Sequence, residues 1–206
     1  MEPQPKIGWV ETSRLIQLDL RTYGAWLPGL GAEWSLLRRV LYAVLWSEMF
    51  GAALLFRLQT FFYEAGWPSL AWMLNVTNRM IYLVSIGRDV RADGGFYIAH
   101  GHVVIDGQTT FGRNVSVGPF VTLGLNTTVF DFRGPTLGDD VFIGTGAKLL
   151  GPIRVGHRAR IGANAVVVSD VPDDHTAVGV PARAQPSHAS SATRSEDAPR
   201  VVSLRS

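Results

Sequence analysis

The sequence predicts a mainly β protein, in which a parallel β-helix of hexapeptide repeats follows an α-helical N-terminal region. The first observation behind this prediction is a six-residue rhythm that runs from Ile105 to Pro172. The second is the apolar, helix-like composition of residues 1–91, and the third is the polar composition of the last residues. We therefore divide the chain into a helical region (1–91), a β-helix (92–183) and a disordered tail (184–206).

Ten hexads share one pattern, with an interruption after the fourth. The first position is always a large apolar residue, the second is Gly in seven of the ten, and the fifth is small or β-branched. The first positions are Ile105, Phe111, Val117, Leu123, Leu137, Ile143, Leu149, Val155, Ile161 and Val167. A period this short is typical of a β-helix, in which each repeat supplies one short strand and one corner.

The repeat also predicts the shape of the domain. Three hexads make one triangular coil, the first and fifth side chains point inward, and successive coils hydrogen-bond to each other around one continuous core. Gly at the second position is expected where the backbone bends sharply with a positive φ. The alternative, an ordinary antiparallel β-domain, would need turn signals every ~8–12 residues and alternating strands.

The interruption lies between Leu123 and Leu137, a step of fourteen residues where twelve would keep the register. We expect residues 125–136 to leave the prism as a loop. Loops on a rigid scaffold often carry function, although a tolerated surface insertion is the alternative.

The first region is expected to contain a helix within residues 38–64, ended by Gly66-Trp67-Pro68, and a second helix over residues 69–85. All six Trp of the chain fall in this region. Charged residues keep every apolar stretch below the ~20 residues that span a bilayer. The helices either pack on each other and on neighbouring subunits, which we favour, or lie on a membrane surface with Arg38, Arg39, Arg57 and Arg79 at the headgroups.

Composition narrows the function further. The chain has no Cys, which excludes a disulfide scaffold, a thiolate zinc site and a Cys nucleophile. The net charge of +2 gives no strong field for nucleic acid. The first residues lack the charged and apolar segments of a signal peptide, so we expect a cytoplasmic enzyme, with peripheral contact at the inner face of the membrane as an extension.

Five histidines are the candidates for acid–base chemistry. His188 falls in the tail, and His157 and His175 read as surface residues at corners of the prism. His100 and His102 stand together where the β-helix begins, at the edge of a rigid scaffold, and are therefore the preferred pair.

The sequence from 92 to 184 resembles the hexapeptide-repeat acyltransferases, and within them the serine O-acetyltransferase-like group. The resemblance rests on five segments: Ala99-His100-Gly101-His102, Val121-Thr122-Leu123-Gly124, Gly144-Thr145-Gly146-Ala147-Lys148, Ile161-Gly162-Ala163-Asn164 and Gly179-Val180-Pro181-Ala182-Arg183. It implies a left-handed β-helix, a homotrimer, and acetyl-CoA as cosubstrate in the groove between neighbouring prisms, with no metal.

The resemblance also implies roles for particular residues. His100 matches the catalytic base, which takes a proton from the acceptor hydroxyl as it attacks the thioester. Arg133 would hold an anionic group of the acceptor. The groove for acetyl-CoA would be lined by Gly124, Gly146, Ala147, Lys148, Ala163 and Arg183.

Three departures from serine acetyltransferases bear on the acceptor. Ala99 stands where that group has Asp, and Arg133-Gly134-Pro135 stands where it has Arg-His-Pro. The start of the β-helix is also one residue short, so His102 could replace His100 as the base. We therefore expect a sugar hydroxyl, on an exopolysaccharide or glycolipid precursor, slightly ahead of L-serine.

Two alternatives belong to other classes. A zinc hydratase on the same scaffold would need three convergent His ligands, for which His100, His102 and His157 are the candidates. A non-catalytic trimeric scaffold is the other, because a fold does not determine a function.

Overall fold

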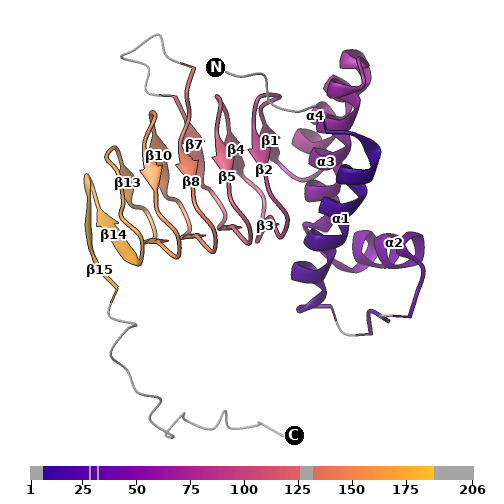
Figure 1. Cartoon of the computed structure of the whole chain (residues 1–206), viewed down its shortest axis with the longest axis horizontal. Coiled ribbons are helices and arrows are strands. Elements are labelled where there is room, and N and C mark those ends of the chain that lie inside the picture. Colours follow the sequence, from indigo (N-terminus) through magenta and orange to yellow (C-terminus); the bar gives the residue numbers. More distant parts are fainter. Residues whose placement is uncertain (1–6, 28, 32, 126–131, 188–206) are drawn as a thin grey trace, which may run out of the picture.

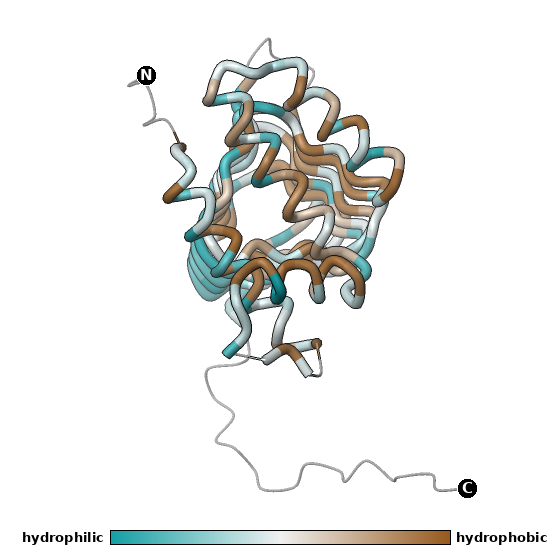
Figure 2. The backbone as a smooth tube through the Cα atoms, turned by 90° about the vertical axis from the view of Figure 1, so that its right-hand side faces the viewer, coloured by the Kyte–Doolittle hydropathy of each residue, from teal (hydrophilic) through white to brown (hydrophobic). Residues whose placement is uncertain are grey.

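The computed structural model describes residues 7–27, 29–31, 33–125 and 132–187. Four helices lie across one end of a stack of β-coils (Figure 1). Figure 2 looks along the axis of that stack, with the helices in front of the coils. The predicted order of a helical region followed by a parallel β-helix is confirmed.

The helices are α1 (Trp9–Gly24), α2 (Leu36–Trp46), α3 (Phe50–Glu64) and α4 (Pro68–Ile81). The single helix expected over residues 38–64 is in fact two. Ser35 caps α2, because its hydroxyl accepts a hydrogen bond from the Arg38 amide (3.4 Å). Ser47 breaks the run, because its hydroxyl accepts from the Phe50 amide (3.1 Å) at the start of α3. Pro68 opens α4 as its first residue.

The central helix of this region is α3, which packs against α1, α2, α4 and β3 (Tyr97–Ile98). Its buried residues include Phe50, Ala52, Ala53 and Phe56. The expected packing of the helices on each other is therefore present. Within the described residues, no helix is long and apolar enough to cross a bilayer.

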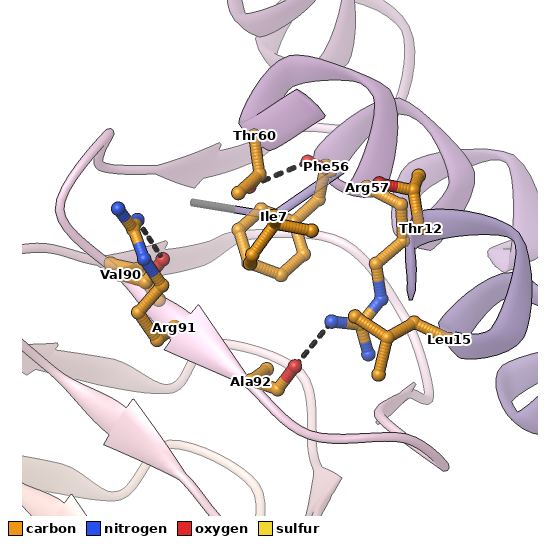
Figure 3. Close-up of a pocket in the computed structure, with 9 residues that line it drawn as sticks. All are labelled: Ile7, Thr12, Leu15, Phe56, Arg57, Thr60, Val90, Arg91 and Ala92. Atoms are coloured by element: carbon orange, nitrogen blue, oxygen red, sulfur yellow. Dashed lines mark hydrogen bonds between the residues drawn. The ribbon is translucent and has the colours of Figure 1, made fainter. Parts of the chain in front are cut away.

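Arg57 joins the helices to the coils and is buried, at 4% side-chain exposure. Its guanidinium makes two hydrogen bonds to the Asp19 carboxylate (2.8 and 3.0 Å) and donates to the carbonyls of Ala92 and Asp93. Figure 3 shows this side chain reaching from α3 to the strand that carries Ala92. The alternative in which Arg57 faces membrane headgroups is therefore wrong for this residue, because its side chain is buried and paired with Asp19.

The coils form three faces, each a sheet in which neighbouring strands come from successive coils. The first face contains β1 (Val84–Ile86), β4 (Val103–Ile105), β7 (Thr122–Gly124), β10 (Lys148–Leu150) and β13 (Val166–Val167). The second contains β2 (Arg91–Ala92), β5 (Thr110–Phe111), β8 (Thr136–Leu137) and β11 (Arg154–Val155). The third contains β3, β6 (Ser116–Val117), β9 (Phe142–Ile143), β12 (Arg160–Ile161), β14 (His175–Gly179) and β15 (Ala182–Pro186).

The first positions of the hexads form ladders through the core. On the first face, parallel pairing aligns Ile86, Ile105, Leu123, Leu149 and Val167, and all five are buried. The fifth positions that the structure describes are buried as well, for example Val115 and Ala165 at 0% exposure. The predicted inward orientation of both positions is thus confirmed.

The first coil begins earlier than the boundary expected at residue 92. Ile86, Ala92 and Ile98 occupy first positions, and Val90 and Phe96 occupy fifth positions, all of them buried. The six-residue rhythm therefore extends upstream to Ile86. One extra residue between Ile98 and Ile105 separates this coil from the regular hexads.

The glycines at the second position have a different role from the one expected. Positive φ occurs instead at the fourth position, as in Asn114, Phe120, Asp140 and Asn164. A Cβ on Gly144 would lie 2.8 Å from the Ala163 amide nitrogen of the next coil. Gly is therefore required here by the close approach of successive coils rather than by its φ.

Across the interruption, the chain passes from the first face of the triangular prism to the second. Leu137 pairs with Phe111 and Val155 on the second face, so the fourteen-residue step from Leu123 carries eight more residues than one hexad needs. Most of the expected loop, residues 126–131, lies outside the described residues.

The expected tail begins inside an ordered strand. Antiparallel pairing of β15 with β14 continues through Ala184 and Gln185 to Pro186, because this strand covers the otherwise unpaired edge of β14. Residues 188–206 of the expected tail lie outside the described residues.

Candidate active site

The site candidates fall on two edges of the prism. The histidine edge comprises the corners where the chain passes from the third face to the first, residues 99–102, 118–121, 144–147 and 162–165. The loop edge comprises the corners from the first face to the second; among them are residues 106–109 and the described residues 125 and 132–135. The two edges border opposite sides of the first face.

His100 lies on the histidine edge, beside the helical region. Its Nδ1 is 3.2 Å from Oε2 of Glu48, in the connection between α2 and α3. The two side chains are 64% and 79% exposed. Gly101 allows this corner to form, because a Cβ there would lie 2.3 Å from the Tyr82 carbonyl oxygen. A carboxylate at Nδ1 favours the tautomer that leaves Nε2 free to accept a proton.

His102 occupies the same corner but has other surroundings. It has a positive φ of 62°, and its ring stacks on Phe120 of the next coil, with centroids 4.6 Å apart and planes 9° apart. Both rings therefore lie on the surface of the histidine edge, which also carries Gly146 and Ala163.

Lys148 lies at the end of the next corner along this edge. Its ammonium donates to the carbonyls of Phe120 (2.8 Å) and Gly146 (3.1 Å). These bonds hold the charge at the histidine edge and use two of its three N–H donors. The third donor can meet an anionic group.

The other residues implied for the cosubstrate lie in different parts of the β-helix. Gly146 and Ala163 lie on the histidine edge, whereas the Ala147 side chain points into the core and is fully buried, so that only its backbone can face a ligand. Arg183 is exposed on β15, opposite Val178. Gly124 ends β7 at the loop edge, where a Cβ would meet nothing within 4 Å.

Arg133 also lies on the loop edge, so one chain does not bring it next to His100. Its segment docks on the coil before it, because the Gln108 amide donates to the Phe132 carbonyl (2.8 Å) and the Thr110 amide to the Pro135 carbonyl (3.0 Å). A Cβ on Gly134 would lie 2.1 Å from the Thr109 hydroxyl. Gly134, which stands where the Arg-His-Pro pattern has His, therefore packs against Thr109 too closely to carry a side chain.

A pocket of about 270 Å³ opens beside His100, between the helical region and β3. Its lining comes from α1, α2 and their connections and from the strand before His100: Tyr23, Trp26, Leu27, Trp46, Ser47, Glu48, Met49, Tyr97, Ile98, Ala99 and His100. Partial burial, and then the nearby charge of Glu48, raise the pKa of the Tyr97 phenol. The sequence did not reveal this pocket; the only signal was one carboxylate, Glu48, in an otherwise apolar stretch.

The remaining histidines lie elsewhere. His157 is at a corner between the second and third faces, where its Nδ1 accepts from the Asp139 amide (3.0 Å). His175 lies at the start of β14, with Nδ1 2.7 Å from the Asp173 carbonyl oxygen. One chain therefore does not bring His157 to His100 and His102, as the zinc alternative would need.

Comparison with known proteins agrees with the β-helix fold. A family model described as "Bacterial transferase hexapeptide (six repeats)" matches residues 134–169. A serine acetyltransferase of Helicobacter pylori (strain J99) is 41% identical over 133 residues, which are 64% of this chain and 78% of the relative. The chain belongs to the serine acetyltransferase-like group of the hexapeptide-repeat acyltransferases. Its fold is accordingly the left-handed parallel β-helix that the repeat implies.

This family member spans less than two thirds of the length of several curated relatives that it matches. It is 41% identical to a serine acetyltransferase of Bacillus pumilus over 62% of this chain, and spans 59% of that relative. The solved serine acetyltransferase of Neisseria gonorrhoeae in complex with serine matches with a TM-score of 0.72 and 33% identity, over 86% of this chain and 70% of that one. A serine acetyltransferase solved in complex with CoA matches with a TM-score of 0.72 and 28% identity, over 86% and 71% of the two chains.

Proposed function

We propose that this chain is an acetyl-CoA-dependent O-acetyltransferase with His100 as its general base. The observation that carries the proposal is the contact between His100 Nδ1 and Glu48, at the end of the edge that carries Lys148, Gly146 and Ala163. Family membership supports the reaction class, since the solved relatives include a serine acetyltransferase with CoA.

The chemistry assigned to His100 follows from its surroundings. Nδ1 holds its proton toward the Glu48 carboxylate, so the lone pair of Nε2 can take the proton of an acceptor hydroxyl. Glu48 then stabilises the imidazolium that forms, as the carboxylate of a catalytic triad does. As the C–O bond to the acceptor forms, the C–S bond of the thioester breaks, and CoA leaves as a thiol with the proton that His100 returns. Proton transfer to a positioned base contributes roughly a hundred- to ten-thousandfold to the rate of such reactions.

Acetyl-CoA would supply the acetyl group as a thioester, and the residues of the histidine edge fit it. Gly146 and Ala163 carry no bulky side chain, which allows a flexible arm to approach the backbone. The third donor of Lys148 and the exposed guanidinium of Arg183 are suited to phosphate groups. The ring of Phe120, 54% exposed, offers an apolar surface between His102 and Lys148.

We propose that the active unit is a homotrimer. Gly124 and Arg133 lie on the loop edge, so they can join His100 and Lys148 only if the loop edge of one chain faces the histidine edge of another. A heterologous contact of this kind closes into a ring of three chains when each chain is rotated by a third of a turn relative to the next.

For the acceptor, we propose a sugar hydroxyl ahead of L-serine. The named relatives are serine acetyltransferases, which supports serine. Ala99 and Gly134 remove two polar side chains of that group, and the packing of Gly134 against Thr109 leaves no room to restore one of them. A neutral hydroxyl compound needs neither group.

A thiol-release assay tests this proposal. Purified protein is supplied with acetyl-CoA and a panel of L-serine and sugar acceptors, and binding of acetyl-CoA is measured separately by calorimetry. We expect His100→Asn to lower kcat by about 10²–10⁴ while acetyl-CoA still binds. Failure of the wild-type protein to bind acetyl-CoA would refute the proposal, and loss of turnover in His102→Asn but not in His100→Asn would transfer the base to His102.

A further inference from the structure

We propose that the pocket beside His100 is a binding site for one sugar ring, with Trp26, Trp46 and Tyr97 as its aromatic walls. This inference rests on the proposed function and adds the residues that select the acceptor. The pocket is contiguous with His100, so a ring held in it would present a hydroxyl to that imidazole.

The size of the pocket suits a single ring. Its volume of about 270 Å³ is near the lower end of the range for small-molecule sites, roughly 300–1,000 Å³. The walls come from three separate parts of the chain: the end of α1, the end of α2 with its connection to α3, and β3. Tyr23 fixes two of these parts to each other, because its hydroxyl accepts from the Ile98 amide (2.9 Å) and donates to the Ile98 carbonyl (3.2 Å).

Two tryptophans in this pocket are exposed to solvent. Trp26 is 75% exposed and Trp46 is 70% exposed, although each could bury a large apolar surface against a ligand. A sugar ring has an apolar face of C–H groups that packs on an aromatic ring, with its hydroxyls at the rim. The Tyr97 ring lies 4.7 Å from Tyr23, which holds it in place.

The polar groups of the pocket suit a neutral ligand better than an amino acid. Among its lining residues, Glu48 is the only acidic side chain, and neither Lys nor Arg is present. The ammonium of free serine could face Glu48, but its carboxylate would find no Lys or Arg in this lining to pair with. Sugar hydroxyls can instead donate to Glu48 and accept from the phenol of Tyr97, which its raised pKa keeps protonated.

The test compares Trp26→Ala and Trp46→Ala with Trp72→Ala, a matched control on α4 whose side chain is 66% exposed. The acceptors are methyl glycosides of glucose, galactose and mannose, N-acetylglucosamine and L-serine. We expect the KM for the best sugar to rise roughly tenfold in each pocket variant, with the KM for acetyl-CoA and the oligomeric mass unchanged. Trp72→Ala should behave as the wild type.

Intrinsic tryptophan fluorescence gives a second readout that needs no turnover. The same sugars should change the emission of the wild type and of His100→Asn, and the change should shrink in Trp26→Ala and Trp46→Ala. The inference is overturned if serine is acetylated while no sugar is, or if the tryptophan variants change the oligomeric mass instead of the KM. Those outcomes leave the acetyltransferase proposal standing, whereas a protein that binds no acetyl-CoA defeats that proposal by itself.

Discussion

At the scale of single residues, the contact between His100 and Glu48 acts through orientation more than through charge. Both side chains are more than half exposed, and ion pairs in such positions contribute at most about 1 kcal/mol to stability. A fixed partner at Nδ1 nevertheless selects one tautomer and one direction of the ring. The carboxylate that serine acetyltransferases carry just before the histidine is replaced here by Ala99, and Glu48 supplies one from the helical region.

Removing this carboxylate should slow the reaction without unfolding the protein. We expect Glu48→Ala to lower kcat by roughly ten- to a hundredfold, less than the loss of the base itself, and Glu48→Gln to lie between that variant and the wild type. The KM for acetyl-CoA should not change. Glu11→Ala removes an exposed carboxylate that pairs with Arg14 and serves as the control. An unchanged kcat in Glu48→Ala would show that the contact has no part in catalysis.

Tyr23 links stability to alkaline pH. It is buried, and this burial raises the pKa of its phenol well above the ordinary value. The folded protein therefore holds the phenolic proton more tightly than the unfolded chain. The stability that this group contributes is fully present below the unfolded pKa of about 10 and is lost as the pH rises above it.

Urea unfolding between about pH 8 and pH 11 checks this expectation. The wild-type midpoint should fall more steeply with pH than that of Tyr23→Phe, while Tyr63→Phe should follow the wild type. At neutral pH, Tyr23→Phe should itself be less stable by about 1–3 kcal/mol, because the Ile98 amide and carbonyl lose their partner. Parallel pH curves for the wild type and Tyr23→Phe would contradict the argument.

At the scale of elements, the coils are limited by how closely their corners stack. A Cβ added to Gly118, Gly138 or Gly144 would lie 2.8–2.9 Å from backbone atoms of the next coil. Backbone cannot yield as the end of a flexible side chain can, so each of these corners admits only glycine. The repeated glycine at the second position of the hexads therefore reflects the short distance between successive coils.

A pair of glycine substitutions separates this effect from the general cost of replacing glycine. Gly144→Ala should lower the free energy of unfolding by about 1–3 kcal/mol, as overpacking does. Gly124→Ala adds the same methyl group where nothing lies within 4 Å, and should change stability by at most about 0.5 kcal/mol. Urea unfolding of both variants at neutral pH gives the comparison, and equal losses would count against the steric explanation.

How far the sequence predicts this structure depends on the range of the interactions involved. The hexads repeat one local arrangement, so Ile105, Leu123 and Leu149 identify the core without any knowledge of distant contacts. The first coil is harder to recognise in the sequence, because Ala92 is small for a first position and an extra residue after Ile98 breaks the six-residue period. The strand pairing of this coil with the next one, rather than any residue type, identifies it.

The candidate site was predictable only in part, for the same reason. Lys148 and Ala163 belong to the regular hexads, so the period places them near one edge, whereas His100 lies before the extra residue that breaks the period. Glu48, Trp26 and Trp46 reach His100 only through the packing of α1 and α2 on the first coil. No spacing in the sequence encodes that packing.

At the scale of the whole molecule, the two edges that carry the candidate residues face different directions. His100 and Lys148 are on one side of the first face, and Gly124 and Arg133 are on the other. The proposed site would therefore need two chains, and in the proposed closed trimer every such site would be equivalent.

Mixing two defective chains tests this arrangement. Light scattering should first give the mass of three copies of the 22.5 kDa chain. His100→Asn and Arg133→Ala should each be poorly active alone. A randomly mixed one-to-one assembly should recover about a quarter of the wild-type rate, because that share of its sites combines the intact edge of each chain. Activity equal to the average of the two parents would mean that each site lies within one chain.

The two ends of the coil stack are finished differently, and this bears on how the protein avoids polymerising. A stack of parallel coils presents unpaired N–H and C=O groups at each end, which can recruit the end of another stack into a fibril. At one end α1 and α3 contact β3 and α4 contacts β1, while at the other β15 pairs with β14 in the antiparallel sense. The helices that bring Glu48 and two tryptophans to His100 thus also block growth, and losing them would expose a fibril-forming surface along with an incomplete site.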